Sequence, residues 1–264
     1  MNIVDVLPGD GPVILGQPHG GTWLPDALTA RLNPNGRGLA DTDWHIGQLY
    51  DGLLSSATVV RSNVHRYAID ANRDPAGVSL YPGQNTTSLC PVSDFDGAAI
   101  WQDGQDPSED EILARRAAYH APYHEALAEE VARVTARHGV AIIYDCHSIR
   151  SEIPFLFEGL LPVFSIGTND GQTCAGAIAD ATVAACAAES HVLNGRFKGG
   201  WTTRHYGRPE TGVHAIQMEL AQRAYLAAET PPWSYDPARA GPTRATLHTI
   251  LAALDRLARS GALA

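Results

Sequence analysis

Short apolar runs and longer segments with helical periodicity alternate along the chain. A run of four to eight mostly apolar residues bounded by Gly, Pro or polar residues fits a buried strand. The strands predicted in this way are GPVILGQ (11–17), ATVVRS (57–62), HRYAID (65–70), VAIIYD (140–145), VFSIGT (163–168) and GVHAIQMEL (212–220).

Helical periodicity fills much of the chain between these runs. One long helix has clear end signals, because Ser108 and Glu111 have capping-box spacing and Gly139 follows its last turn. Pro122 lies inside this helix and should kink or split it. The predicted helices are 43–55, 108–138, the alanine-rich segment 174–189, and 242–261.

Two segments lack either pattern. Residues 74–106 are rich in Gly, Pro, Ser, Asp and Asn, and residues 194–212 are rich in Gly and Arg. Long irregular segments of this kind are usually functional or mobile. The alternation of strands and helices over 264 residues predicts one α/β domain spanning 1–264. We expect a mixed, mostly parallel sheet with helices on both faces.

Composition narrows the class of protein. Hydrophobic residues make up 44% of the chain and charged residues 18%, which is typical of a globular protein. No apolar run approaches the roughly 20 residues of a membrane helix. The N-terminal residues lack a signal-peptide pattern, so we expect a cytoplasmic protein. The net charge of −10 argues against nucleic acid as a partner, and a small anionic substrate would need local cations or a metal.

Titratable side chains gather where the predicted strands end. His19 follows the first strand, Asp145 and His147 follow the apolar part of 140–145, and Glu219 lies at the end of 212–220. The acidic segment 41–45 opens a predicted helix. Ligand sites of open α/β sheets lie beyond the strand ends, so these groups are candidates for one site.

Two histidines, one carboxylate and an open position form the usual catalytic zinc arrangement. His19 and His147 can supply the imidazoles, and Asp43 or Asp41 can supply the carboxylate. Glu219 is then free to serve as the general base for a metal-activated water. The four cysteines form no CxxC pair, which argues against a zinc-thiolate cluster or a disulfide framework.

Several of these residues also fit structural roles. Asp41 could cap the helix that follows it, and Asp145 could orient a ligand histidine from behind. Cys146 next to His147 suggests a thiol nucleophile, but adjacent strand residues point to opposite faces. His120 and His124 have helical i, i+4 spacing without the Glu of a zinc-binding HExxH motif, so structural or surface roles are expected.

Six segments taken together resemble the N-formylglutamate amidohydrolase (deformylase) family of histidine degradation. They follow the family's order and span nearly the whole chain, which makes the resemblance specific although PHGG alone is weak. The segments are PHGGTWLP (18–25), DTDWHIGQLYD (41–51), RYAIDANRDP (66–75), DCHSI (145–149), NGRFKGGWTTRHYGRP (194–209) and HAIQMEL (214–220).

The resemblance implies a fold similar to the zinc carboxypeptidases and aspartoacylases. It also implies a zinc-dependent amidohydrolase that converts N-formyl-L-glutamate to L-glutamate and formate. The resemblance further implies that His19, Asp43 and His147 are the metal ligands and that Glu219 is the base. The HxxE pair of carboxypeptidases is absent because position 22 is Thr. Asp43 is therefore the first choice as carboxylate ligand, with Asp41 in reserve.

The same resemblance assigns residues to the substrate. Asp70-Ala71-Asn72-Arg73 matches a D-x-N-R motif in which Asn and Arg hold a carboxylate, and Arg suits bidentate recognition. A surface ion pair is the alternative for Arg73. The loop after residue 194 offers candidates for the second carboxylate and the oxyanion, or is a solvated basic loop. These candidates are Arg196 and Thr203 for binding, and Arg204 and His205 for catalysis.

Two other functions fit the same residues. One is hydrolysis of another N-acyl amino acid or a short peptide, since a few loop residues could change the acyl pocket. The other is a catalytically silent module that binds a metal or an amino acid. Zinc is the implied metal, although iron, cobalt or manganese would also suit a mixed nitrogen and oxygen site.

Overall fold

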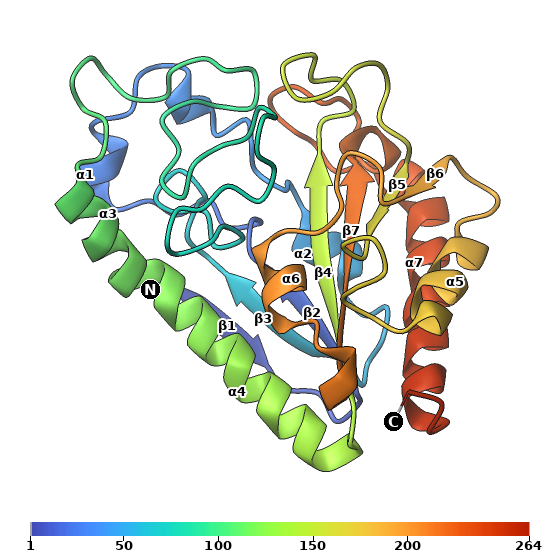
Figure 1. The fold of residues 1–264 in the computed structure, drawn as a ribbon. Coiled ribbons are helices and arrows are strands. Elements are labelled where there is room, and N and C mark those ends of the chain that lie inside the picture. Colours follow the sequence, from blue (N-terminus) through green and yellow to red (C-terminus); the bar gives the residue numbers. More distant parts are fainter. Residues whose placement is uncertain (1, 264) are drawn as a thin grey trace.

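A seven-stranded sheet crosses the molecule in the computed structural model, which describes residues 2–263 (Figure 1). The strands are β1 (Val4–Leu7), β2 (Val13–Gln17), β3 (Thr58–Ser62), β4 (Ala141–Ile149), β5 (Phe164–Gly167), β6 (His191–Leu193) and β7 (Val213–Ala221). Their order is β1-β3-β2-β4-β7-β5-β6. Pairs β2-β3, β2-β4, β4-β7 and β5-β6 are parallel, whereas β1-β3 and β5-β7 are antiparallel. The prediction of a mixed, mostly parallel sheet is confirmed.

Helices cover both faces of this sheet. The α-helices are α1 (Asp26–Thr29), α2 (Ile46–Tyr50), α3 (Glu109–Arg115), α4 (Ala121–His138), α5 (Gly176–Ala185), α6 (Trp201–Tyr206) and α7 (Pro237–Arg259). Short turns are η1 (Gly36–Gly38), the π-helical η2 (Arg116–His120), η3 (Pro209–Thr211) and η4 (Gln222–Ala224). Helix α4 packs on one face, and α2, α5 and α7 pack on the other (Figure 1). Within 2–263, none of the helices has both the length and the apolar character needed to cross a bilayer.

Both faces of strand β4 contact an apolar core, but only one face carries the candidate site residues. Ile143 belongs to the apolar cluster under α4, together with Leu127 of that helix. Tyr144 and Cys146 belong to the cluster on the α7 side. Because side chains alternate along a strand, Asp145 and His147 lie on the α4 side. The Cys146 thiol is buried in the opposite core, where burial raises its pKa well above the ordinary value, so it is not a nucleophile beside His147.

Two predictions about strands are wrong. Strand β4 continues to Ile149, so Asp145 and His147 lie within it and not beyond its end. Residues 65–70 are not a strand, because the chain turns there: the Ala68 amide donates to the His65 carbonyl (2.9 Å). Strands β1 and β6 were not predicted, since both are short edge strands with a weak apolar pattern.

Helix boundaries also differ in part. The Ser108 hydroxyl accepts from the Glu111 amide and Gly139 has φ 73°, which confirms both end signals of the long helix. The π-helical turn η2 lies immediately before Pro122, whose missing N–H and bulky ring disturb the regular ladder. Helix α2 begins only at Ile46, so Asp41 does not cap it. The predicted loop 194–212 contains the helix α6 and the turn η3.

Truncation of Ile143 tests the packing of β4 against α4. Ile143→Ala should lower the free energy of unfolding by about 3 kcal/mol, because a fully buried side chain leaves a cavity between sheet and helix. Urea denaturation measures this change. Leu7→Ala is the control at a residue that is 57% exposed, and it should stay within about 0.5 kcal/mol. Equal losses in the two variants would contradict the described core.

Candidate metal centre

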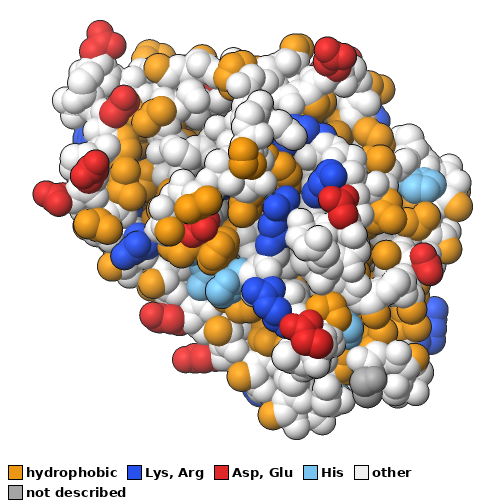
Figure 2. All heavy atoms as spheres, in the orientation of Figure 1, with side chains coloured by type: hydrophobic (Ala, Val, Ile, Leu, Met, Phe, Trp, Pro, Cys, Tyr) orange, Lys and Arg blue, Asp and Glu red, His pale blue; other side chains and the backbone are white. Residues whose placement is uncertain are grey.

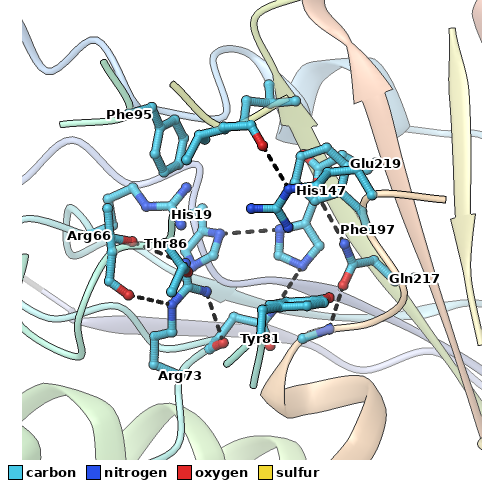
Figure 3. Close-up of a pocket in the computed structure, with 16 residues that line it drawn as sticks. His19, Arg66, Arg73, Tyr81, Thr86, Phe95, His147, Phe197, Gln217 and Glu219 are labelled. Atoms are coloured by element: carbon cyan, nitrogen blue, oxygen red, sulfur yellow. Dashed lines mark hydrogen bonds between the residues drawn. The ribbon is translucent and has the colours of Figure 1, made fainter. Parts of the chain in front are cut away.

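Two imidazoles and one carboxylate converge at the carboxyl ends of the central strands. His19 follows β2, His147 lies on β4, and Asp43 precedes α2. The two Nδ1 atoms are 3.1 Å apart, and Asp43 Oδ2 lies 3.3 Å from His147 Nδ1 and 4.0 Å from His19 Nδ1. All three side chains are buried. Figure 3 shows nitrogen atoms of the two rings pointing toward each other, and both rings line a cavity.

The outer nitrogen of each ring is held by a second carboxylate. His19 Nε2 lies 2.7 Å from Asp70 Oδ1, and His147 Nε2 lies 3.1 Å from Asp145 Oδ2. An ionised carboxylate can only accept, so Nε2 carries the proton in both neutral rings. This tautomer leaves a lone pair on each Nδ1, as in carboxylate–histidine–metal arrangements. The interpretation of Asp145 as an acceptor behind a ligand histidine agrees with this geometry.

The inner atoms match the geometry of a metal ion. Tetrahedral ligands at 2.0–2.1 Å from zinc lie about 3.3 Å from one another. The separations here are 3.1 and 3.3 Å for the pairs that include His147 and 4.0 Å between Asp43 and His19. Asp43 Oδ1 is buried and has no hydrogen-bond partner among residues 2–263. His19, Asp43 and His147 could therefore hold one divalent cation. The reserve ligand Asp41 is not in this group, since its Oδ2 accepts from the Phe95 amide (3.0 Å).

The surroundings of the two histidines shift their pKa values in opposite directions. Burial and the Arg66 guanidinium lower the pKa of His19. Burial also opposes charge on His147, but the Asp145 and Asp43 carboxylates outweigh it and raise the pKa well above the ordinary value. A proton on His147 is thus stabilised by the Asp145 and Asp43 carboxylates. A divalent cation in place of this proton would be stabilised by the same carboxylates.

Glu219 lies beside the cluster but outside the ligand group. It stands on β7 directly opposite His147 in the parallel β4-β7 pair. Its Oε2 accepts from Gln217 Nε2 (3.1 Å), and Gln217 Oε1 accepts from the Gly200 amide (2.7 Å). Burial raises the pKa of Glu219 to about 8; the charge of His147 lowers it and that of Asp43 adds to the rise. A carboxylate made more basic in this way suits proton transfer near neutral pH.

Positive charge lines the cavity above the cluster. Its volume is about 60 Å³, and its walls include Arg66, Arg73 and Arg196 together with Glu219. Lys and Arg side chains gather near the middle of this face in Figure 2, although the chain carries a net charge of −10. This local reversal of sign favours a small anion in the cavity.

Both predicted binding arginines are fixed by irregular segments of the chain. Arg73 Nε donates to the Thr87 carbonyl and its Nη2 to the Thr87 hydroxyl, both at 3.0 Å. Arg196 Nε donates to the Leu156 carbonyl (2.9 Å), and its Nη2 donates to the Asn85 carbonyl (2.8 Å). The segment 74–106, which has no regular helix or strand, thus supplies contacts for both arginines.

Asn72 and Thr203 lie around the Asp145 carboxylate. Asn72 Nδ2 lies 3.0 Å from His147 Nε2 and 3.3 Å from Asp145 Oδ2, and its Oδ1 accepts from the Thr202 amide (2.7 Å). Thr203 Oγ1 donates to Asp145 Oδ2 (3.3 Å). Asn72 lines the cavity, but its amide is already engaged by the protein.

Arg204 and His205 do not line the cavity. Arg204 Nε donates to the Gly199 carbonyl (2.9 Å), and the His205 ring stacks on Trp201 with centroids 4.7 Å apart. Both residues belong to α6, which was not predicted.

Sequence reasoning missed two charged residues of the site. Arg66 Nη2 donates to Asp70 Oδ2 (2.6 Å), and its Nη1 lies 3.5 Å from Asp43 Oδ1. Asp70 joins this arginine to His19. Both residues fall in the segment wrongly predicted as a strand, where a strand would have separated their side chains. Their i, i+4 spacing, with opposite charges, was a usable signal for a turn.

The chain is similar to known proteins over most of its length. A family model described as N-formylglutamate amidohydrolase matches residues 11–226. The chain is 45% identical over 250 residues to N-formylglutamate deformylase of Pseudomonas aeruginosa, covering 93% of each, and 43% identical over 247 residues to that of Pseudomonas putida, covering 92% of each.

Two solved structures share the fold. The N-formylglutamate amidohydrolase from Ralstonia eutropha has a TM-score of 0.78 at 24% identity, covering 96% of this chain and 98% of that one. A gene product of Agrobacterium tumefaciens has a TM-score of 0.74 at 20% identity, covering 97% and 96%. By the extent of the family match and the identity to the Pseudomonas proteins, this chain belongs to the N-formylglutamate amidohydrolase family.

Proposed function

We propose that this protein hydrolyses N-formyl-L-glutamate to L-glutamate and formate. The observation that carries the proposal is the cluster of His19, Asp43 and His147 with Glu219 beside it, on the floor of an arginine-lined cavity. The names of the Pseudomonas relatives support the substrate. In the reaction, water adds to the formyl carbon, the C–N bond breaks, and the amine leaves with a proton.

We infer that the ion is Zn²⁺, because two imidazoles and one carboxylate are a common catalytic zinc set. When bound, a divalent ion supplies positive charge that polarises the formyl carbonyl and acidifies a water molecule. Asp70 and Asp145 keep the two histidines in the tautomer that such an ion requires.

We assign both proton transfers of the reaction to Glu219. It takes a proton from the attacking water and passes it to the leaving nitrogen, while the Gln217 amide donates to its Oε2 and fixes its orientation. Arg66 lines the cavity with its Nη1 3.5 Å from Asp43 Oδ1, and we assign it to the negative charge that develops on the formyl oxygen. This assignment replaces Arg204 and His205, which lie outside the cavity.

The two carboxylates of the substrate require two cationic groups. Arg73 and Arg196 line the cavity and are both held by backbone carbonyls, which suits bidentate recognition of a carboxylate. We assign Arg73 to the α-carboxylate, because the adjacent Asn72 contacts His147 and so places Arg73 near the cluster. Arg196 then takes the distal carboxylate. Asn72 acts by donating from its Nδ2 to the Asp145 carboxylate that orients His147.

Formate release tests the proposed substrate and the need for a metal together. The purified protein should release formate from N-formyl-L-glutamate, lose this activity after treatment with a chelator, and regain it with Zn²⁺. N-acetyl-L-glutamate and a formylated dipeptide should be poorer substrates. Faster hydrolysis of either alternative would reject the proposed substrate, and full activity of the chelated protein would reject the metal.

Substitution of the base tests the assigned proton transfer. Glu219→Gln should lower kcat by about 10²–10⁴-fold, because the amide cannot accept the water proton. Metal content, measured by elemental analysis, should equal that of the wild type since Glu219 is not a ligand. Wild-type turnover in this variant would show that another group is the base.

Loss of charge behind His147 tests the orienting role of Asp145. Asp145→Asn should weaken Zn²⁺ binding by about 10–100-fold in a chelator competition, because the ligand imidazole loses its anionic partner. Asp41→Asn is the matched control, since it also changes a buried aspartate but outside the ligand group. The account would be contradicted if both variants lost affinity equally.

A further inference from the structure

Tyr81 lies in a wall that the metal cavity shares with a second cavity. The second cavity has a volume of about 240 Å³ and is lined by residues of the segment 73–89. The first holds only about 60 Å³, which is small beside the roughly 300–1,000 Å³ of typical ligand sites. The residues common to both linings are Arg73, Tyr81, Thr86 and Thr87. Figure 3 shows Tyr81 beside Arg73 at the edge of the metal cavity.

The Tyr81 ring lies close to two guanidinium groups. The central carbon of Arg196 is 5.3 Å from the ring centroid, and that of Arg204 is 5.0 Å away. The hydroxyl donates to the Gly199 carbonyl (2.9 Å) and accepts from the Lys198 amide (3.2 Å). Tyr81 of the irregular segment is therefore bonded to the loop that links Arg196 to helix α6, which carries Arg204.

The Arg196 guanidinium is held on several sides and keeps one nitrogen available. Nε and Nη2 donate to the Leu156 and Asn85 carbonyls. Nη1 makes no hydrogen bond to any residue in the range 2–263. The attraction between a guanidinium and the face of an aromatic ring fixes the plane of the group. A carboxylate in the cavity would then meet a guanidinium whose orientation is set before binding.

We propose that Tyr81 is a positioning residue that fixes Arg196 as the receptor for the distal carboxylate of the substrate. It thereby determines selectivity for N-acyl dicarboxylic amino acids over uncharged ones. The inference rests on the proposed function, in which Arg196 takes that carboxylate. It extends the proposed function because it assigns Tyr81, in the segment 74–106, to the orientation of Arg196.

Two substrates that differ only in the distal charge measure the effect of Tyr81 on Arg196. N-formyl-L-norvaline keeps the formyl group and the α-carboxylate of N-formyl-L-glutamate but lacks the distal charge. In Tyr81→Leu the ratio of kcat/KM for the charged over the uncharged substrate should fall about tenfold, mainly through KM, because the ring no longer orients Arg196. Tyr81→Phe keeps the ring and should stay within about threefold of the wild-type ratio.

Tyr235→Leu is the matched control. Tyr235 is also a half-buried tyrosine, but it packs on Tyr225 and His45, away from the cavity. The ratio should be unchanged in this variant. An unchanged ratio in Tyr81→Leu, or equal losses for both substrates, would overturn the proposal. So would a fall in Tyr81→Phe as large as in Tyr81→Leu, since the ring would then not be the active feature.

Product binding separates failure of this inference from failure of the proposed function. Calorimetry with L-glutamate needs no turnover, and Tyr81→Leu should weaken its binding about tenfold relative to the wild type. Equal affinities for L-glutamate would overturn the role of Tyr81. The absence of formate release by the wild type, with this difference in affinity intact, would reject the proposed reaction and retain the positioning role.

Discussion

Two imidazole nitrogens that face each other across 3.1 Å are the interaction on which the rest of the site depends. Asp70 and Asp145 hold the outer nitrogens, so the lone pairs of His19 and His147 point inward at each other and at the Asp43 carboxylate. Two imidazole lone pairs and a carboxylate that face one another attract a cation to their centre. The fold therefore stabilises a site that favours positive charge, and burial strengthens this preference because water cannot screen it.

The central sheet and the irregular segments make different contributions. The parallel strands β2, β4 and β7 end at one edge, and their register sets His147 beside Glu219 on the face toward α4. These groups lie on a rigid core, which suits ligands and a base that need fixed geometry. The segment 74–106 and the loop around Arg196 hold the cationic groups for the substrate. In the proposed function, separate parts of the chain would therefore carry the metal chemistry and the substrate recognition.

The sequence predicted the fold class and the convergence of His19, Asp43 and His147, because apolar runs mark the central strands and motifs mark the candidate ligands. It failed where buried charge interrupts an apolar pattern. Strand β4 was ended too early since Asp145 and His147 look like loop residues until their partners are known. The links from Asp70 to His19 and from Arg66 to Asp43 join residues distant in sequence, which no local pattern reveals. Helix α6 was hidden in a Gly- and Arg-rich segment, so the directions of Arg204 and His205 could not be foreseen.

Anomalous diffraction at the zinc absorption edge tests the central claim most directly. Crystals grown with Zn²⁺ should show one strong peak about 2.0–2.1 Å from Nδ1 of His19 and of His147, and within about 2.2 Å of an Asp43 oxygen. A peak bonded to other side chains, or none at this cluster, would contradict the assignment of the metal centre.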